Sequence, residues 1–300
     1  MGRLNHYFEK AKLKLRSEGF IPVTKELASF LIRRKFFLQF AFEAFEYHFL
    51  AKFRNIPATV VQVVKNERII SRRILLYASY DAGSAIGTHV VQQLEAFKKE
   101  NYEIIFVTTS PSLPANEYEK IRPLVSICVR RLNEGYDFVS YRVGFDLLGA
   151  RYSSLESLVL MNDSCLGPMF DFGPLLQKMR EASNSVYGIS ISEEIAEHIQ
   201  SYFYHFGSSV LRSPIAKTFF NRIRILYTKW GIVRYFEMGG SQFLITHGVP
   251  LSALIDPRKE EVRSRMEDLG LMEPTREPLA SEWVRLKVSP FYKRSTVGNG

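Results

Sequence analysis

Cysteine is scarce in this sequence of 300 residues, which holds only Cys128 and Cys165. The two do not form the closely spaced pairs that structural zinc sites use, and two cysteines are too few for a disulfide framework. We therefore expect a protein of a reducing compartment, with neither a structural zinc site nor a fold held by disulfides.

Long apolar runs are also missing. No stretch reaches the roughly 18 consecutive apolar residues that a membrane-spanning helix needs. Residues 1–5 lack the apolar stretch of a secretory signal peptide. We expect a cytoplasmic location and no membrane-spanning helix.

The usual signs of nucleic-acid binding are absent too: there is no zinc-finger spacing, no aromatic RNA-binding motif and no long Lys/Arg run. The formal net charge is nevertheless +9, and a basic surplus favours anionic partners. With nucleic acid disfavoured, phosphorylated small molecules and an anionic membrane surface remain open.

What is present is the composition of a globular protein, with 46% hydrophobic and 24% charged residues. The chain is long enough for one large domain with helical additions. Aromatic residues make up 13% of it. An aromatic core explains this share more simply than stacking on a flat ligand does.

Residues 1–55 are expected to form a helical N-terminal extension, because the stretch from Lys25 to Phe53 contains neither glycine nor proline. Its second half is rich in phenylalanine and follows the basic run 33–35. Aromatic and basic residues on one helix suit a membrane interface. Packing on the main domain, or on a second subunit in a homo-oligomer, is the alternative.

Short apolar runs alternate with helical spacing from residue 73 to residue 255. Such alternation predicts an α/β fold of the Rossmann type, a mostly parallel sheet flanked by helices on both faces. The polar and basic residues 256–300 form a separate C-terminal segment. The expected strands are 73–79, 103–109, 124–129, 158–161 and 186–191, the expected helices are 86–99, 140–148 and 172–182, and residues 214–247 are expected to be mostly helical.

Polar residues follow three of these strands, at the edge where open α/β sheets bind ligands. Asp81 leads into a Gly-Ser turn, where it either stabilises the turn or contacts a ligand. The loop 131–137 combines a guanidinium that can clasp phosphate with a glycine that permits close approach. Asp163 stands at a strand tip, where a carboxylate can hold a hard divalent ion or cap the turn.

Several motifs occur in a characteristic order. They are Tyr77–Asp81, Phe106–Ser110, Arg131–Phe138, Leu160–Pro168, Gln200–Phe203, Tyr235–Gln242 and Ser289–Arg294. Together they resemble the rhamnan synthesis protein F family of bacterial polysaccharide and lipopolysaccharide assembly. The resemblance covers about residues 73–295 and leaves the N-terminal segment outside.

The resemblance implies a glycosyltransferase of the GT-A type. Such an enzyme transfers a sugar from a nucleotide-diphosphate sugar to a growing cell-surface polysaccharide or a lipid-linked acceptor. The family name points to rhamnose carried by deoxythymidine diphosphate (dTDP-rhamnose). Asp163 matches the position that holds a divalent cation, Mg²⁺ or Mn²⁺, but the motif reads Asn-Asp-Ser instead of Asp-X-Asp. The implied donor-binding residues are Ser79, Asp81, Arg131, Asn133, Gly135, Asp137, Asn162, Lys293 and Arg294.

Sugar transfer with inversion also needs a base for the acceptor hydroxyl. Glu237, just before Gly239-Gly240, is the candidate; a carboxylate stabilised by a helix start is the alternative. Lys293 and Arg294 either fold over the diphosphate or belong to a solvated tail. The histidines His198, His205 and His247 lack ligand spacing and are interpreted as structural.

Two other interpretations compete with the transferase. One is a sugar-nucleotide hydrolase or nucleotidyltransferase, and the other is a non-catalytic scaffold of a polysaccharide-assembly complex. An acceptor at the inner face of a membrane would account for both the basic surplus and the aromatic helix.

Overall fold

The computed structural model describes residues 37–270 and 279–293. The chain divides into two compact units, Met1–Leu50 and Ala51–Gly300. In the first unit residues 37–48 are helical, and the rest of the predicted helical extension up to residue 36 lies outside the described residues. The three-part division at residues 55, 73 and 256 stays a prediction.

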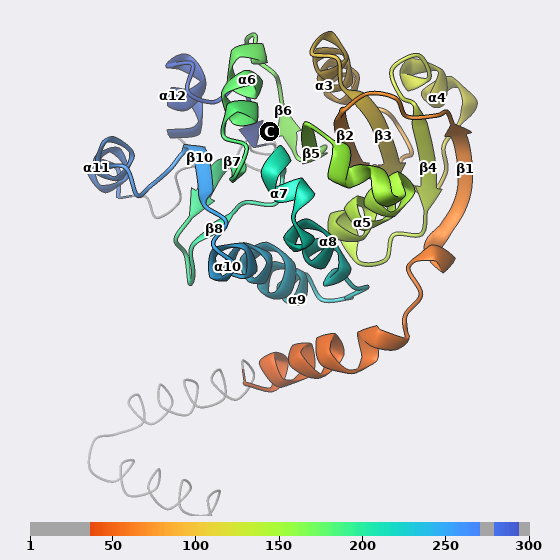
Figure 1. The fold of residues 1–300 in the computed structure, drawn as a ribbon, viewed down its shortest axis with the longest axis horizontal. Helices are drawn as coiled ribbons and strands as arrows, with labels where there is room; N and C mark the ends of the chain where they lie inside the picture. Colours follow the sequence, from red (N-terminus) through yellow and green to blue (C-terminus); the bar gives the residue numbers. More distant parts are fainter. Residues whose placement is uncertain (1–36, 271–278, 294–300) are drawn as a thin grey trace, which may run out of the picture. The chain divides into compact units, whose positions relative to one another are not determined.

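The second unit is built on one sheet with the strand order β1-β4-β3-β2-β5-β9-β7-β10, and β8 pairs with β7 (Figure 1). The strands are β1 Val60–Asn66, β2 Arg73–Ser79, β3 Glu103–Thr108, β4 Ile127–Arg131, β5 Ser157–Asn162, β7 Val186–Ser192, β8 His198–Ile199, β9 Phe203–Gly207 and β10 Leu251–Ile255. A separate two-stranded sheet pairs β6 (Cys165–Leu166) with β11 (Tyr292–Lys293).

The sheet is mixed. Strands β4, β3, β2 and β5 are parallel, as the sequence predicts. Strand β9 runs antiparallel to both β5 and β7, β1 runs antiparallel to β4, and β10 is parallel to β7. The predicted α/β class with a central sheet is confirmed, but parallel pairing is limited to the strands β4, β3, β2 and β5 and to the pair β7–β10.

Helices connect and cover the strands. They are α3 Thr88–Lys99, α4 Ala115–Ile121, α5 Tyr136–Leu148, α6 Gly173–Glu181, α7 Ser208–Arg212, α8 Pro214–Asn221, α9 Lys229–Ile232, α10 Gly239–Thr246, α11 Glu260–Asp268 and α12 Leu279–Arg285. A π-helical turn, η4 (Val233–Met238), joins α9 to α10, and the short 3-10 helices are η1 Leu50–Phe53, η2 Pro57–Thr59 and η3 Gly149–Ser154. None of the helices described is both long enough and apolar enough to cross a bilayer.

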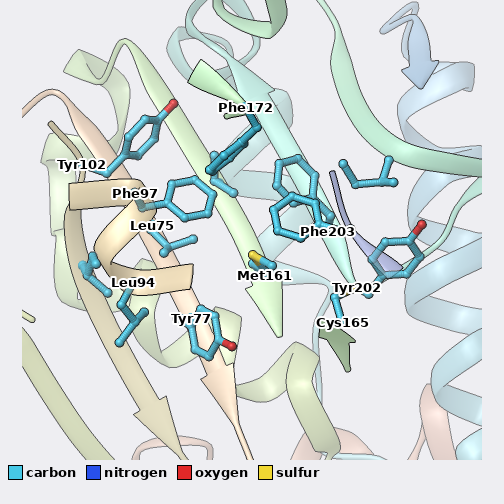
Figure 2. Packing of buried hydrophobic residues seen from close by; sticks show 14 of the residues in the cluster. Leu75, Tyr77, Leu94, Phe97, Tyr102, Met161, Cys165, Phe172, Tyr202 and Phe203 are labelled. Atoms are coloured by element: carbon cyan, nitrogen blue, oxygen red, sulfur yellow. The ribbon is translucent and has the colours of Figure 1, made fainter. Parts of the chain in front are cut away.

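Alternate residues of the central strands pack against helices on opposite faces, because successive side chains of a strand point to opposite sides. On one face Leu75 and Tyr77 join Leu94 and Phe97 of α3 in a buried cluster (Figure 2). The ring of Phe97 meets that of Phe172 edge-on, at 5.1 Å between centroids.

The other face is covered by α5. A Cβ placed on Gly144 of this helix would lie 3.0 Å from Cδ2 of Leu76, so the glycine lets the helix approach β2 closely. Since α5 follows β4 and precedes β5, this packing brings the start of α5 over the carboxyl edge of the sheet.

Candidate active site

The carboxyl ends of the four parallel strands meet at one edge of the sheet. Register pairs Ser79 with Thr108 and Ala78 with Asn162, so the residues that follow β2, β3 and β5 are neighbours. Strand β9 runs the opposite way and begins beside Met161, which brings the residues just before it to the same edge. The sheet therefore gathers segments far apart in the sequence.

Asp163 is fixed at this edge by β2. Its Oδ2 accepts a hydrogen bond of 3.1 Å from the Ser79 hydroxyl and one of 2.8 Å from the backbone nitrogen of Tyr80. Its own backbone nitrogen donates to the carbonyl of Ala78 at 3.3 Å. The structure thus joins two predicted site residues, and Asp163 is partly buried with a defined orientation.

A second carboxylate, Asp137, lies in the first turn of α5 beside Asn162 of β5. The side-chain nitrogen of Asn162 donates to Oδ2 of Asp137 at 2.7 Å. Burial, reinforced by the negative charge of Asp163, raises the pKa of Asp137 to about 6. Asp137 and Asp163 are therefore an electrostatically coupled pair of carboxylates.

Glu237 adds a third acid at this edge. The hydroxyl of Ser201, in the segment before β9, donates to its Oε2 at 2.8 Å. The pKa of Asp137 is raised mainly by burial and by the charge of Asp163, and the charge of Glu237 adds to this effect. Glu237 and Asp137 therefore interact electrostatically. Glu237 lies inside the π-helical turn η4 and not at a helix start, and π-helical turns often occur at functional sites.

Arg131 is buried and turned toward its own loop. Its guanidinium donates to the carbonyls of Leu132 (2.8 Å), Glu134 (2.7 Å) and Tyr136, and to the Ser140 hydroxyl at 2.9 Å. Only 1% of the residue is exposed. In this structure Arg131 shapes the loop that leads to Asp137, and its contact with a donor stays a prediction.

The loop also depends on Gly135, which has a φ of +75°. A Cβ at this position would lie 2.4 Å from Cγ2 of Val139 and 3.2 Å from Cα of Ile225. The glycine therefore permits close packing within the protein. Asn133 is exposed on the same loop.

Asp81 organises the turn after β2. Its Oδ1 accepts hydrogen bonds from the backbone nitrogens of Gly83 (2.9 Å) and Ala85 (3.0 Å). The structure thus shows the turn-forming role, and its contact with a nucleoside stays a prediction.

The C-terminal segment returns to the Asp163 loop through β11. Its backbone pairs antiparallel with β6, and Lys293 stands opposite Cys165, two positions after Asp163. Arg294 lies outside the described residues. The backbone of the late basic segment is thus adjacent to the candidate site, and a phosphate-binding role for Lys293 stays a prediction.

The sequence did not indicate the hydrogen bonds that hold the loop after Asp163. Tyr77 donates its hydroxyl hydrogen to Gln93 of α3, and Gln93 donates to the carbonyl of Cys165 at 2.8 Å. Burial, before the charge of Asp163, raises the pKa of Tyr77 well above its usual value, so the hydroxyl stays protonated as a donor. Ser201 lies within the motif Gln200–Phe203, but nothing in that motif indicates its contact with Glu237.

The edge supplies carboxylates but not a complete protein-made metal site. Among the residues that the structure describes, no three His, Cys, Asp or Glu side chains are grouped to hold a metal ion. A divalent ion at Asp163 would have to complete its shell with water and substrate phosphate oxygens. Mg²⁺ is commonly bound in this way, through one or two carboxylates.

The fold and the site define a mixed α/β protein with carboxylates at the edge of the sheet where such folds bind ligands. Residues 104–296 match the family described as rhamnan synthesis protein F. The chain belongs to this family.

Two curated proteins match part of the chain. The chain is 26% identical over 169 residues to the uncharacterized protein y4gN of Sinorhizobium fredii, covering 55% of this chain and 44% of that protein. It is 29% identical over 132 residues to virulence protein VirA of Vibrio anguillarum, covering 43% of this chain and 42% of that one. The chain thus spans less than half the length of either relative.

Two solved structures resemble the fold loosely. One is a putative nucleotide-diphospho-sugar transferase from Desulfovibrio desulfuricans G20, with 12% identity, a TM-score of 0.34 and coverage of 68% of this chain and 97% of that chain. The other is the bifunctional glycosyltransferase WbbM, with 9% identity, a TM-score of 0.35 and coverage of 63% and 40%.

Proposed function

We propose that the chain is a GT-A-type glycosyltransferase that moves a sugar from a nucleotide-diphosphate donor to a growing bacterial polysaccharide or a lipid-linked acceptor. The observation that carries the proposal is the pairing of Asp163 with Ser79, and of Asp137 with Asn162, at the carboxyl edge of the sheet. Membership of the rhamnan synthesis protein F family supports sugar transfer in polysaccharide assembly.

Asp163 is the residue proposed to hold Mg²⁺ or Mn²⁺. The charges of Asp163 and Glu237 both raise the pKa of Asp137, whereas the guanidinium of Arg131 is turned into its own loop. An anionic diphosphate next to these acids needs a counter-charge, which supports a divalent ion. When bound, such an ion stabilises the negative charge of the departing nucleotide diphosphate.

Glu237 is the proposed base of an inverting transfer. Its carboxylate takes the proton of the acceptor hydroxyl while that oxygen bonds to the anomeric carbon and the bond to the diphosphate breaks. The Ser201 hydroxyl occupies Oε2 and leaves Oε1 as the atom that receives the proton.

Rhamnose from dTDP-rhamnose is the proposed donor substrate, on the strength of the family name. We further propose a cytoplasmic protein at the inner membrane face, attached or self-associated through the N-terminal helices. Phe37, Phe42 and Phe45 of the helix at 37–48 each expose more than half of their surface, which supports this role. Loss of vesicle binding after deletion of residues 1–55 would support the membrane contact, and unchanged binding would reject it.

Calorimetry with nucleoside diphosphates and Mg²⁺ or Mn²⁺, followed by a donor screen for diphosphate release, tests the transferase. We expect metal-dependent binding that Asp163→Ala weakens at least tenfold, while Asp146→Ala, at an exposed position of α5, leaves it unchanged. Release of free sugar without an acceptor would indicate the hydrolase. Absence of binding, or equal binding by Asp163→Ala, would indicate the scaffold.

A further inference from the structure

Glu237 has a second neighbour, His198 of β8. The distance between Nε2 of His198 and Oε1 of Glu237 is 3.7 Å, and the two side chains expose only 8% and 15% of their surface. The other ring nitrogen, Nδ1, lies 2.7 Å from the carbonyl oxygen of Ala196. Each end of the imidazole thus faces one defined oxygen.

These contacts fix where the hydrogen of a neutral imidazole sits. A carbonyl oxygen only accepts hydrogen bonds, so Nδ1 must carry the hydrogen that it shares with Ala196. In the neutral ring Nε2 then presents a lone pair to the Glu237 carboxylate. Two acceptors that face each other in a buried place attract a proton between them, on either Nε2 or Oε1.

The surrounding structure keeps β8, and with it His198, in place. The backbone nitrogen of Ile199 donates to the Ser241 hydroxyl at 3.1 Å, and the carbonyl of Ile199 accepts from the Tyr204 hydroxyl at 3.0 Å. Gln242 donates to the carbonyl of Glu197 at 2.7 Å. Contacts from α10 and β9 therefore hold the imidazole against the π-helical turn, and such support makes a site precise.

Other ionisable groups also face Glu237. Asp137 at the start of α5 and Tyr204 of β9 both feel its charge. Arg234 lies on the same turn as Glu237. Tyr204 stays protonated, because burial raises its pKa well above the usual value. Asp137 is therefore the group whose titration must be separated from that of the His198–Glu237 pair.

We propose that His198 is the proton-sharing partner of Glu237, a positioning residue that acts through the base; the inference rests on the proposed function. The acceptor O–H bond breaks and its proton passes to Oε1 of Glu237 as the oxygen bonds to the anomeric carbon. The proton is then shared with the lone pair of Nε2, while Nδ1 keeps its hydrogen on Ala196. The electron pair of the broken sugar–phosphate bond leaves with the nucleotide diphosphate.

The pH profile of kcat tests this role. An imidazole ordinarily takes up a proton about two pH units above a glutamate carboxyl. His198→Gln should therefore lower kcat at least tenfold and move the acid limb of the profile toward lower pH. A purely structural histidine would leave the position of the limb unchanged. Asp137→Asn serves as the comparison, because a limb that moves only in that variant belongs to Asp137 and overturns the proposal.

A second measurement does not depend on catalysis. Nuclear magnetic resonance of ¹⁵N-histidine-labelled full-length protein reports on each ring nitrogen of His198 separately, in the wild type and in Glu237→Gln. We expect the substitution to change the signal of Nε2, which faces Oε1, and to leave the hydrogen of Nδ1 on the side of Ala196. An unchanged Nε2 signal would overturn the pairing. If Nε2 responds to the substitution but no donor reacts, the proposed function fails while the pair stands.

Discussion

Asn162 and Asp137, on β5 and α5, are joined by a hydrogen bond of 2.7 Å from the amide nitrogen to the carboxylate. The bond stabilises the charged form of Asp137, and without it the pKa of Asp137 would lie still higher than about 6. Near neutral pH the charged carboxylate of Asp137, which the charge of Asp163 disfavours, therefore destabilises the folded protein.

Asp137→Asn should raise the stability of the protein near neutral pH. The folded-state pKa of about 6 lies above the ordinary value of 3.8, so the unfolded state loses this proton first. Stability from the protonated form is present below pH 3.8 and is lost as pH rises through about 6. Urea unfolding at pH 7.5 should show a gain of about 2–3 kcal/mol in the variant, and almost none at pH 3.8.

Asp146→Asn on the same helix is the matched control. Asp146 is exposed and pairs with Arg142 at 2.8 Å, so its loss should cost less than about 1 kcal/mol. An equal effect of the two substitutions, or a gain in Asp137→Asn that does not depend on pH, would contradict the assignment.

Arg131→Met should destabilise the protein by about 3 kcal/mol, because the carbonyls of Leu132, Glu134 and Tyr136 all lose the donor that the buried guanidinium supplies. Arg130→Met provides the comparison. The Arg130 side chain makes one exposed hydrogen bond, to Pro111, and its loss should cost less than about 1 kcal/mol. Chemical unfolding measures both, and similar values for the two would count against the loop-shaping role.

Gly135→Ala should cost more than the backbone conformation alone demands. The left-handed φ of +75° costs an alanine about 1 kcal/mol, and the added Cβ also collides with Val139 and the backbone of Ile225. Gly248→Ala shares the conformation, with a φ of +74°, but has nothing within 4 Å. Thermal unfolding should separate the two variants, and equal melting temperatures would refute the close packing at Gly135.

His205 should make the protein sensitive to acid. Burial lowers its pKa to about 3, well below the ordinary 6.5, so the unfolded state takes up the proton first. The stability held above pH 6.5 is therefore lost as pH falls toward 3, by about 1.4 kcal/mol per pH unit. In His205→Leu, the drop in unfolding free energy between pH 7 and pH 4.5 should be about 2–3 kcal/mol smaller than in the wild type.

His247→Leu, at an exposed position, is the control for the exchange of a histidine for leucine. Neither ring nitrogen of His205 has a hydrogen-bond partner among the described residues, so its leucine variant should lose little at neutral pH. An acid dependence that persists in His205→Leu would assign the effect to another group.

The parallel half of the fold was open to prediction because buried parallel strands form continuous apolar runs. Strands β2, β3 and β5 stand out in this way, and with them the tips that carry Ser79 and Asp163. Strand β1 was not predicted because it lies at the edge of the sheet, where all of its residues are half-buried or exposed and form no buried apolar run. Strands β9 and β10 are five residues each, and a buried histidine interrupts the apolar character of β9.

The side-chain partners within the site were beyond sequence reasoning. The sequence places Asp137 and Asn162 after different strands, but only the packing of α5 across the sheet shows that they touch. The role of Arg131 was also not predictable, because a buried structural arginine and a phosphate-binding arginine look alike in sequence. The structure shows four acceptors within the protein around its guanidinium.

The pairing of β11 with β6 has a consequence for the order of biosynthesis. The segment that follows Asp163 finds its strand partner in residues 292–293, which come after every strand of the main sheet. A ribosome makes the strands of the parallel core before these residues, so a growing chain can form that core while this loop still lacks its neighbour. Completion of the acidic edge therefore waits for the synthesis of β11.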